Sequence, residues 1–195
     1  MIQTERLILR PYKMTDLKDY YEYVSQPNVG PRCGWKPYDN IEKAKERLEH
    51  ETQKQYQLAI YLKEENKVIG SIEIMNIKPD RWTDDINPDT TRELGALLHE
   101  NYWNKGIMTE AVRAAIKFCF DYLNMERVVA GFYEPNIGSG KMQQKSGMQI
   151  IGRVPNYINW YTTETPCDLI KTMITKQQYL DNPIYKDVKI IVENN

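Results

Sequence analysis

The chain has 195 residues, a length that suits one domain or one domain with a small addition. Its 26 basic and 27 acidic residues are interspersed and give a formal net charge of −1, which disfavours nucleic acid and anionic membranes as partners. No apolar stretch approaches the ~20 residues of a membrane span. Residues 1–13 lack the apolar centre of a signal peptide, so we expect a cytoplasmic protein.

The three cysteines give no sign of a disulfide framework or a metal site. Cys33, Cys119 and Cys167 are odd in number and widely spaced, and no histidine cluster accompanies them. We therefore expect reduced thiols and no bound metal.

The N-terminal part of the chain reads as a strand followed by a helix. Residues 4–10 alternate polar and apolar side chains, which is typical of a half-buried strand. Thr15 or Asp16 is a suitable N-cap for a helix that runs to about Val24.

A loop rich in proline and glycine follows over residues 26–39 and carries Trp35 and Tyr38. Asn40 then caps a second predicted helix over residues 41–53. The two helices and their loop form a helix-loop-helix unit.

Two apolar runs, residues 56–62 and 68–77, are joined by a short polar segment and predict a β-hairpin. Residues 78–91 carry four aspartates. We interpret them as a solvated loop, with attraction of a cationic amine as the alternative.

The most informative stretch is a strand, a turn and a helix. Residues 93–98 form a short apolar run that predicts a buried strand. In the next run, Glu110, Arg113 and Lys117 follow one another at spacings of three and four, which places them on one stripe of a helix. We predict this helix over residues 106–122, with its apolar side against a sheet.

The turn ahead of this helix is predicted to bind a pyrophosphate. A helix that begins at a glycine leaves several N–H groups without intrahelical partners, and such an end attracts anions. Lys105 adds a positive charge, and Gly106 lets a phosphate approach the backbone. A plain strand-to-helix turn is the alternative. The predicted site comprises Trp103, Asn104, Lys105, Gly106, Ile107, Met108 and Thr109.

Residues 138–141 read Gly-Ser-Gly-Lys, but they do not form a P-loop motif. Pro135 stands where that motif needs its first glycine, and Met142 stands where it needs a serine or threonine. Asn136 and Ser139 are residue types that favour helix starts, so we predict a short helix here.

Three further segments, residues 127–132, 149–158 and 168–175, have the composition and alternation of strands. Residues 188–192 suit an extra edge strand or a contact with a partner.

Three stretches resemble the GNAT superfamily of acyl-CoA-dependent N-acetyltransferases, and within it the RimJ/RimL-type branch. Residues 102–111 resemble the pyrophosphate turn of the branch, with Gly106 as the strict match. Residues 4–10 resemble the opening of the branch, and residues 136–139 resemble the Asn-x-x-Ser element of the family. The similarity assigns residues 1–180 to an N-acetyltransferase domain and residues 181–195 to a C-terminal extension.

This resemblance implies an α/β (α+β) fold of the GNAT type. The expected sheet is mixed, mostly antiparallel and six- to seven-stranded, with helices on both faces. Its fourth and fifth strands splay apart to admit the pantetheine arm of acetyl-CoA. By the same resemblance, the main chain of Ala96 and Leu98 holds this cosubstrate, Asn136 contacts the pantetheine arm, and Ser139 lies near the thioester sulfur.

Acyl transfer to an amine needs a neutral nucleophile, a stabilised oxyanion and a proton for the departing thiolate. Ser139 is the candidate proton donor. Glu93 and Glu134 flank the splay, and each is either a base acting through water or a carboxylate without a catalytic role.

The resemblance places Trp35, Tyr38 and Trp160 on the acceptor side. An α-amine with a pKa of ~7.7 to 8.0 is neutral far more often at pH 7 than a lysine amine with a pKa of ~10.4, so a protein N-terminus, of ribosomal-protein type, is the expected acceptor. A polyamine, an amino sugar or an antibiotic stays open as the acceptor, as does a non-catalytic acyl-CoA sensor. The oligomeric state is also open, with a homodimer as one option.

Overall fold

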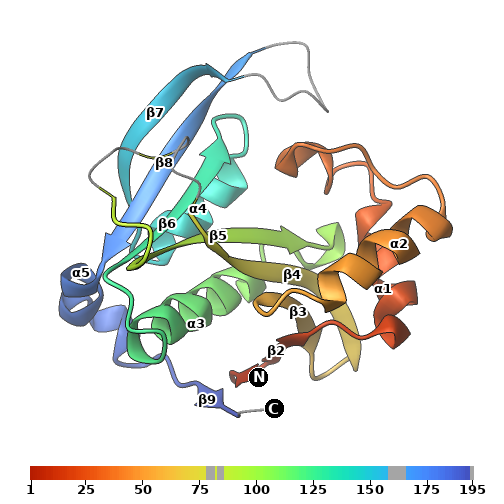
Figure 1. Ribbon diagram of the computed structural model, residues 1–195, viewed down its shortest axis with the longest axis horizontal. Coiled ribbons are helices and arrows are strands. Elements are labelled where there is room, and N and C mark those ends of the chain that lie inside the picture. Colours follow the sequence, from red (N-terminus) through yellow and green to blue (C-terminus); the bar gives the residue numbers. More distant parts are fainter. Residues whose placement is uncertain (78–81, 83–85, 158–165, 194–195) are drawn as a thin grey trace.

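One mixed sheet organises the protein. The computed structural model describes residues 1–77, 82, 86–157 and 166–193, and its described strands follow the order β7-β8-β6-β5-β4-β3-β2-β1-β9 across the sheet (Figure 1). Every described pair of neighbours is antiparallel except β5 and β6, which are parallel. This mixed, mostly antiparallel arrangement with helices confirms the predicted fold class.

The strands are β1 (Ile2–Gln3), β2 (Leu7–Pro11), β3 (Gln57–Leu62), β4 (Lys67–Asn76), β5 (Thr91–Leu98), β6 (Arg127–Tyr133), β7 (Gln149–Tyr157), β8 (Cys167–Thr175) and β9 (Ile191–Val192). The helices are α1 (Leu17–Val24), α2 (Ile41–Thr52), α3 (Ile107–Asp121), α4 (Ile137–Lys145) and α5 (Lys176–Asp181).

The predicted number of six to seven strands is wrong, because the described part of the chain contributes nine. The two additional strands, β1 and β9, have two residues each and pair with one another. A two-residue strand shows no periodicity in sequence, since it exists only because the neighbouring backbone is there to pair with it. The short helix α5 was also not predicted.

Helices cover both faces of the sheet, as expected (Figure 1). Alternate side chains of β3 show this directly: Leu58, Ile60 and Leu62 pack in the cluster that contains the buried side of α3, whereas Ala59 packs with α1 and α2 on the opposite face. No helix in the described ranges is long and apolar enough to cross a membrane.

The C-terminal residues complete the edge of the sheet that begins at the N-terminus. Val192 in β9 pairs with Ile2 in β1, and the two chain ends lie side by side (Figure 1). Tyr185 is buried, and its hydroxyl donates to the carbonyl of Ser146 at 2.7 Å. Of the two alternatives for residues 188–192, the structure therefore contains the edge strand.

Candidate functional site

The parallel strands β5 and β6 separate partway along their length. Their pairing runs from Thr91 and Arg127 to Leu94 and Ala130 and then stops, although β5 continues to Leu98. Among the described strands, the last part of β5 is therefore paired only with β4. This is the splay expected between the fourth and fifth predicted strands.

Main-chain groups of β5 face the opening. The N–H of His99 donates to the carbonyl of Ile69 in the β4 direction at 2.8 Å, so the alternating residues Ala96 and Leu98 direct their N–H and C=O groups the other way. Two contacts agree with this direction. The indole Nε1 of Trp103 donates to the Leu98 carbonyl at 2.8 Å, and the Cys33 thiol lies 3.8 Å from the Ala96 carbonyl.

The turn between β5 and α3 holds two residues in the left-handed region. Asn104 has φ of 62° and Gly106 has φ of 74°, a conformation that glycine adopts without strain. Gly106 is the N-cap of α3, and no described side chain caps this N-terminal end of the helix. The N–H groups of Ile107, Met108 and Thr109 consequently have no intrahelical acceptor and point out of the helix end.

The N-terminal strand region anchors this turn. Arg6 donates through Nη1 to the Lys105 carbonyl at 3.1 Å and forms an ion pair with Glu110 on α3 at 2.6 Å. Glu110 also accepts from the Thr4 hydroxyl at 2.6 Å. Burial alone would raise the pKa of Glu110, but the hydrogen bonds from Thr4 and Arg6 outweigh it and lower that pKa.

A cavity of about 1220 Å³ runs from the start of α3 along the splay to the loop after α1. It brings together most of the predicted site residues: Trp35, Tyr38, Glu93, Ala96, Leu98, Trp103, Asn104, Gly106, Ile107, Met108, Thr109, Asn136 and Ser139. We call the part formed by residues 96–109 and α4 the donor end. The part formed by the loop after α1, by α2 and by Glu73, Trp82 and Glu93 is the acceptor end.

Two predicted site residues lie outside the cavity, and the structure does not describe a third. Lys105 does not line the cavity, and its ammonium lies 5.3 Å from the ring centroid of Tyr102. Glu134 is also outside the cavity and pairs with Arg153 at 3.2 Å, both side chains being more than half exposed. Trp160 lies outside the described residues.

Helix α4 presents Ser139 to the cavity. Asn136 caps the helix by accepting from the Ser139 N–H at 3.3 Å, and its amide donates to the Arg32 carbonyl at 3.3 Å. The helix lies close to β6 because residue 140 is glycine: a Cβ there would come within 2.7 Å of the Phe132 ring. Asn136 is thus a cap that also lies at the cavity wall.

The acceptor end is lined by carboxylates. Glu93 is only 8% exposed, and one of its oxygens accepts from Trp82 Nε1 at 3.2 Å. Glu51, on α2, pairs with Arg47 at 2.5 Å and with Lys54 at 3.1 Å. Glu73 on β4 pairs with the same lysine at 3.1 Å. Glu51 and Glu73 are therefore already paired with cations of the chain.

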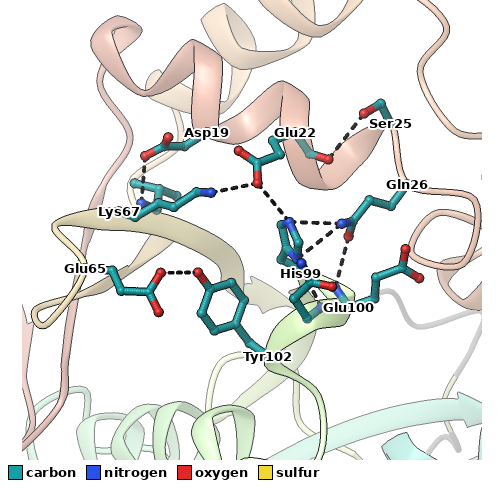
Figure 2. Close-up of polar contacts among 11 residues, drawn as sticks. Asp19, Glu22, Ser25, Gln26, Glu65, Lys67, His99, Glu100 and Tyr102 are labelled. Carbon is teal, nitrogen blue, oxygen red and sulfur yellow. Dashed lines mark hydrogen bonds and ion pairs between the residues drawn. The ribbon is translucent and has the colours of Figure 1, made fainter.

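A polar cluster around the buried His99 joins α1 to the segment just after β5 (Figure 2). His99 is 2% exposed, and its Nδ1 accepts from the Asn101 N–H at 3.1 Å, which leaves the Nε2 proton for Glu22 at 3.1 Å. Gln26, two residues after the end of α1, accepts from the Glu100 N–H at 3.0 Å. The cluster fixes α1 and the start of the loop after it against the segment that leads into the turn before α3.

Sequence reasoning missed several residues of the cavity. Glu51, Glu73 and Trp82 belong to segments interpreted as a helix, a hairpin and a solvated loop, and only the fold brings them to Glu93. Gln143 is buried on α4, where a polar side chain at a core position was the available signal. The described residues contain no group of metal ligands.

Comparison with known proteins agrees with this geometry. The family model described as "Acetyltransferase (GNAT) domain" matches residues 6–149. An acetyltransferase of the GNAT family from Bacillus anthracis superposes with a TM-score of 0.79 at 22% identity, covering 90% of this chain and 98% of that chain.

Two other solved structures are similar in fold. The spermidine N-acetyltransferase of Vibrio cholerae in complex with CoA and spermine has a TM-score of 0.72 at 15% identity, with 90% of this chain and 99% of that chain covered. The ribosomal-protein-S5-alanine acetyltransferase of Vibrio fischeri has a TM-score of 0.69 at 24% identity, with 89% and 95% covered. At these identities the likeness shows the fold alone. The family match over most of the chain, together with the splayed strands, shows that the protein belongs to the GNAT acetyltransferase family and is an N-acetyltransferase.

Proposed function

We propose that the protein transfers an acetyl group from acetyl-CoA to the α-amine of a peptide or protein N-terminus. The observation that carries this proposal is the splay, which leaves the main chain of Ala96 and Leu98 facing a cavity that runs from the phosphate turn to Glu93. Such an opening suits an extended acyl-pantetheine arm, because its amide groups need main-chain partners when water is excluded.

The residues at the donor end fit the chemistry of the cosubstrate. The N–H groups at the start of α3 would hold the diphosphate, and the glycine at position 106 keeps that end open. Lys141 and Lys145 line the same cavity from α4 and add positive charge for the remaining phosphate. In the proposal, Trp103 does not bind the diphosphate. Its indole N–H donates to the Leu98 carbonyl and so orients the end of β5.

The catalytic roles follow from position. Ser139 is proposed to donate a proton to the departing thiolate, since Ser139 lines the cavity. Glu93 is proposed to accept the amine proton through water, with Trp82 orienting its carboxylate. Glu134 has no part in this proposal, because it lies outside the cavity beside Arg153.

The acceptor end favours a single amine over a polyamine. A polyamine needs several carboxylates that are not already paired, but Glu51 and Glu73 are bound to Arg47 and Lys54. An α-amine needs less help from a base than a lysine amine, since its pKa of ~7.7 to 8.0 lies much nearer neutral pH. The placement within the RimJ/RimL-type branch, supported by residues 4–10 and 102–111, belongs to the same proposal.

A polyamine is the second candidate, favoured by the three carboxylates that line the acceptor end. Release of the CoA thiol, measured with acetyl-CoA against peptides bearing only an α-amine, peptides bearing only a lysine amine, spermidine and an aminoglycoside, separates the candidates. We expect the highest kcat/KM with the α-amine peptide. Preference for spermidine or for the lysine peptide would contradict the proposed acceptor, and binding of acetyl-CoA without turnover would indicate a sensor.

A further inference from the structure

We infer that Gln143 is a positioning residue that keeps the hydroxyl of Ser139 oriented as a proton donor. The inference rests on the proposed role of Ser139 and adds a second residue to that step. Gln143 lies one helical turn after Ser139 on α4 and is 3% exposed. Gln143 is among the residues at the cavity wall, but its amide is almost fully buried and bonds to Ser139, Gly131 and Thr172.

The hydrogen bonds of Gln143 determine which way its amide points. Its Nε2 atom lies 3.3 Å from the Gly131 carbonyl and 3.1 Å from the Ser139 Oγ, and its Oε1 lies 2.6 Å from the Thr172 hydroxyl. A carbonyl oxygen only accepts, so the amide atom beside Gly131 must be the NH₂ group. The reversed amide would place two acceptors against each other at that position.

This orientation leaves one role for the Ser139 hydroxyl. The second hydrogen of the Gln143 amide is donated to the Ser139 Oγ, which therefore accepts on its buried side. Within the part of the chain that the structure describes, no hydrogen bond uses the Ser139 hydroxyl as a donor. Its single proton is thus available on the cavity side, where a thiolate would need it.

Thr172 anchors the amide from the sheet. It lies on β8 with no exposed surface, its hydroxyl donates its one proton to Gln143 Oε1 at 2.6 Å, and the Ala130 carbonyl lies 3.1 Å from the same hydroxyl oxygen. The amide is thus held between β6, β8 and α4. Because contacts with three elements hold the Gln143 side chain in one conformation, its N–H already points at the Ser139 oxygen.

The test compares Gln143→Met with Gln144→Met, a matched control on the exposed side of the same helix. Methionine keeps the length of the side chain and removes its donor. With Gln143→Met we expect kcat to fall about tenfold, less than the ~10² that Ser139→Ala should cost as the loss of a general acid. The KM for acetyl-CoA should stay within about twofold, and Gln144→Met should match the wild type.

A double variant separates positioning from a structural role. In a Ser139→Ala background, Gln143→Met should cause no further loss, because there is no hydroxyl left to orient. Thr172→Val should lower kcat in the same direction, and Thr172→Ser should restore it. These two variants keep Gln143 itself, so they test the inference even if Gln143→Met does not fold.

A second readout does not depend on an amine acceptor. A hydroxyl that donates to the sulfur of bound CoA favours its thiolate, so the pH at which the thiolate absorbance appears should rise in Ser139→Ala and in Gln143→Met. Gln144→Met should titrate like the wild type.

The outcomes are distinct. An equal loss from Gln143→Met in both backgrounds, or no change in kcat and in the thiolate titration while Ser139→Ala is slow, would overturn the inference and leave the proposed function standing. Failure of the wild-type protein to bind CoA in calorimetry would overturn both.

Discussion

The donor end and the acceptor end of the cavity are built on different principles. At the donor end, the groups that face the opening include main-chain N–H and C=O groups of Ala96, Leu98 and the start of α3, which lie within one short stretch of sequence, together with side chains of α4. At the acceptor end they are side chains from α2, β4, β5 and the loop containing Trp82. We therefore expect acetyl-CoA binding at the donor end to depend mainly on backbone conformation, and amine recognition at the acceptor end to depend on side-chain identity.

Glu93→Gln is expected to have the largest effect. The loss should concern the reaction with the amine and leave acetyl-CoA binding unaffected. Removing a base costs ~10² or more in rate, so kcat/KM for the amine should drop by about that factor while acetyl-CoA binding in calorimetry stays unchanged. Glu134→Gln is the discriminating variant, since that carboxylate is exposed beside Arg153. A larger loss in Glu134→Gln than in Glu93→Gln would reverse the assignment.

His99→Leu tests the cluster that connects the two ends. The change leaves the Asn101 N–H, Gln26 and Glu22 without their imidazole partner, which should cost about 1–3 kcal/mol of unfolding free energy. Thermal unfolding should show a lower Tm, by ~2–4 °C for each kcal/mol lost. His50→Leu on the exposed face of α2 is the control. Equal Tm values for the two variants would mean that the cluster does not hold the ends together.

Gly106→Val changes the backbone preference of the donor end. At φ of 74°, a β-branched residue is strained by ~1–2 kcal/mol or more, so the turn should open and the KM for acetyl-CoA should rise about tenfold. Gly152→Ala, where an added Cβ meets nothing within 4 Å, should leave KM unchanged. An unaltered KM in Gly106→Val would show that the phosphate is held by other groups.

Glu110→Gln probes the anchoring of the phosphate turn through pH. The folded protein lowers the pKa of Glu110, so its carboxylate contributes stability above the ordinary value of 4.5, and this contribution is lost as the pH falls through the lowered value. The pair with Arg6 is partly exposed, which limits the effect to about 0.5 kcal/mol. Urea unfolding should show the difference between variant and wild type at pH 7, and the difference should shrink in acid. A difference that grows on acidification would contradict this assignment.

Lys105→Ala should have the smallest effect. The Lys105 ammonium lies over the Tyr102 ring and outside the cavity, so the KM for acetyl-CoA should change by less than about threefold, as for a screened surface charge. Steady-state kinetics with varied acetyl-CoA measures it. A tenfold rise would show that a side-chain charge, and not the backbone, dominates the donor end.

The difference between local signals at the donor end and long-range contacts at the acceptor end also explains how much of the fold and site the sequence could predict. The strand, turn and helix of residues 93–122 were predicted nearly as they are, because their periodicity and the glycine at 106 are local signals. The two-residue strand β1 was missed since it depends on pairing with neighbouring backbone, and β9 was expected only as one of two alternatives for residues 188–192. Glu93 and Glu134 looked alike in sequence, and only the fold placed one in the cavity and the other beside Arg153.

The central claim is that main-chain donors at the start of α3 hold the diphosphate of acetyl-CoA and so place its sulfur beside Ser139. A crystal structure of the protein with CoA tests it most directly. We predict diphosphate oxygens within hydrogen-bond distance of the N–H groups of Ile107, Met108 or Thr109, and the sulfur next to the Ser139 hydroxyl. A diphosphate bound by side chains away from this helix end, or a sulfur outside the splay, would contradict the account.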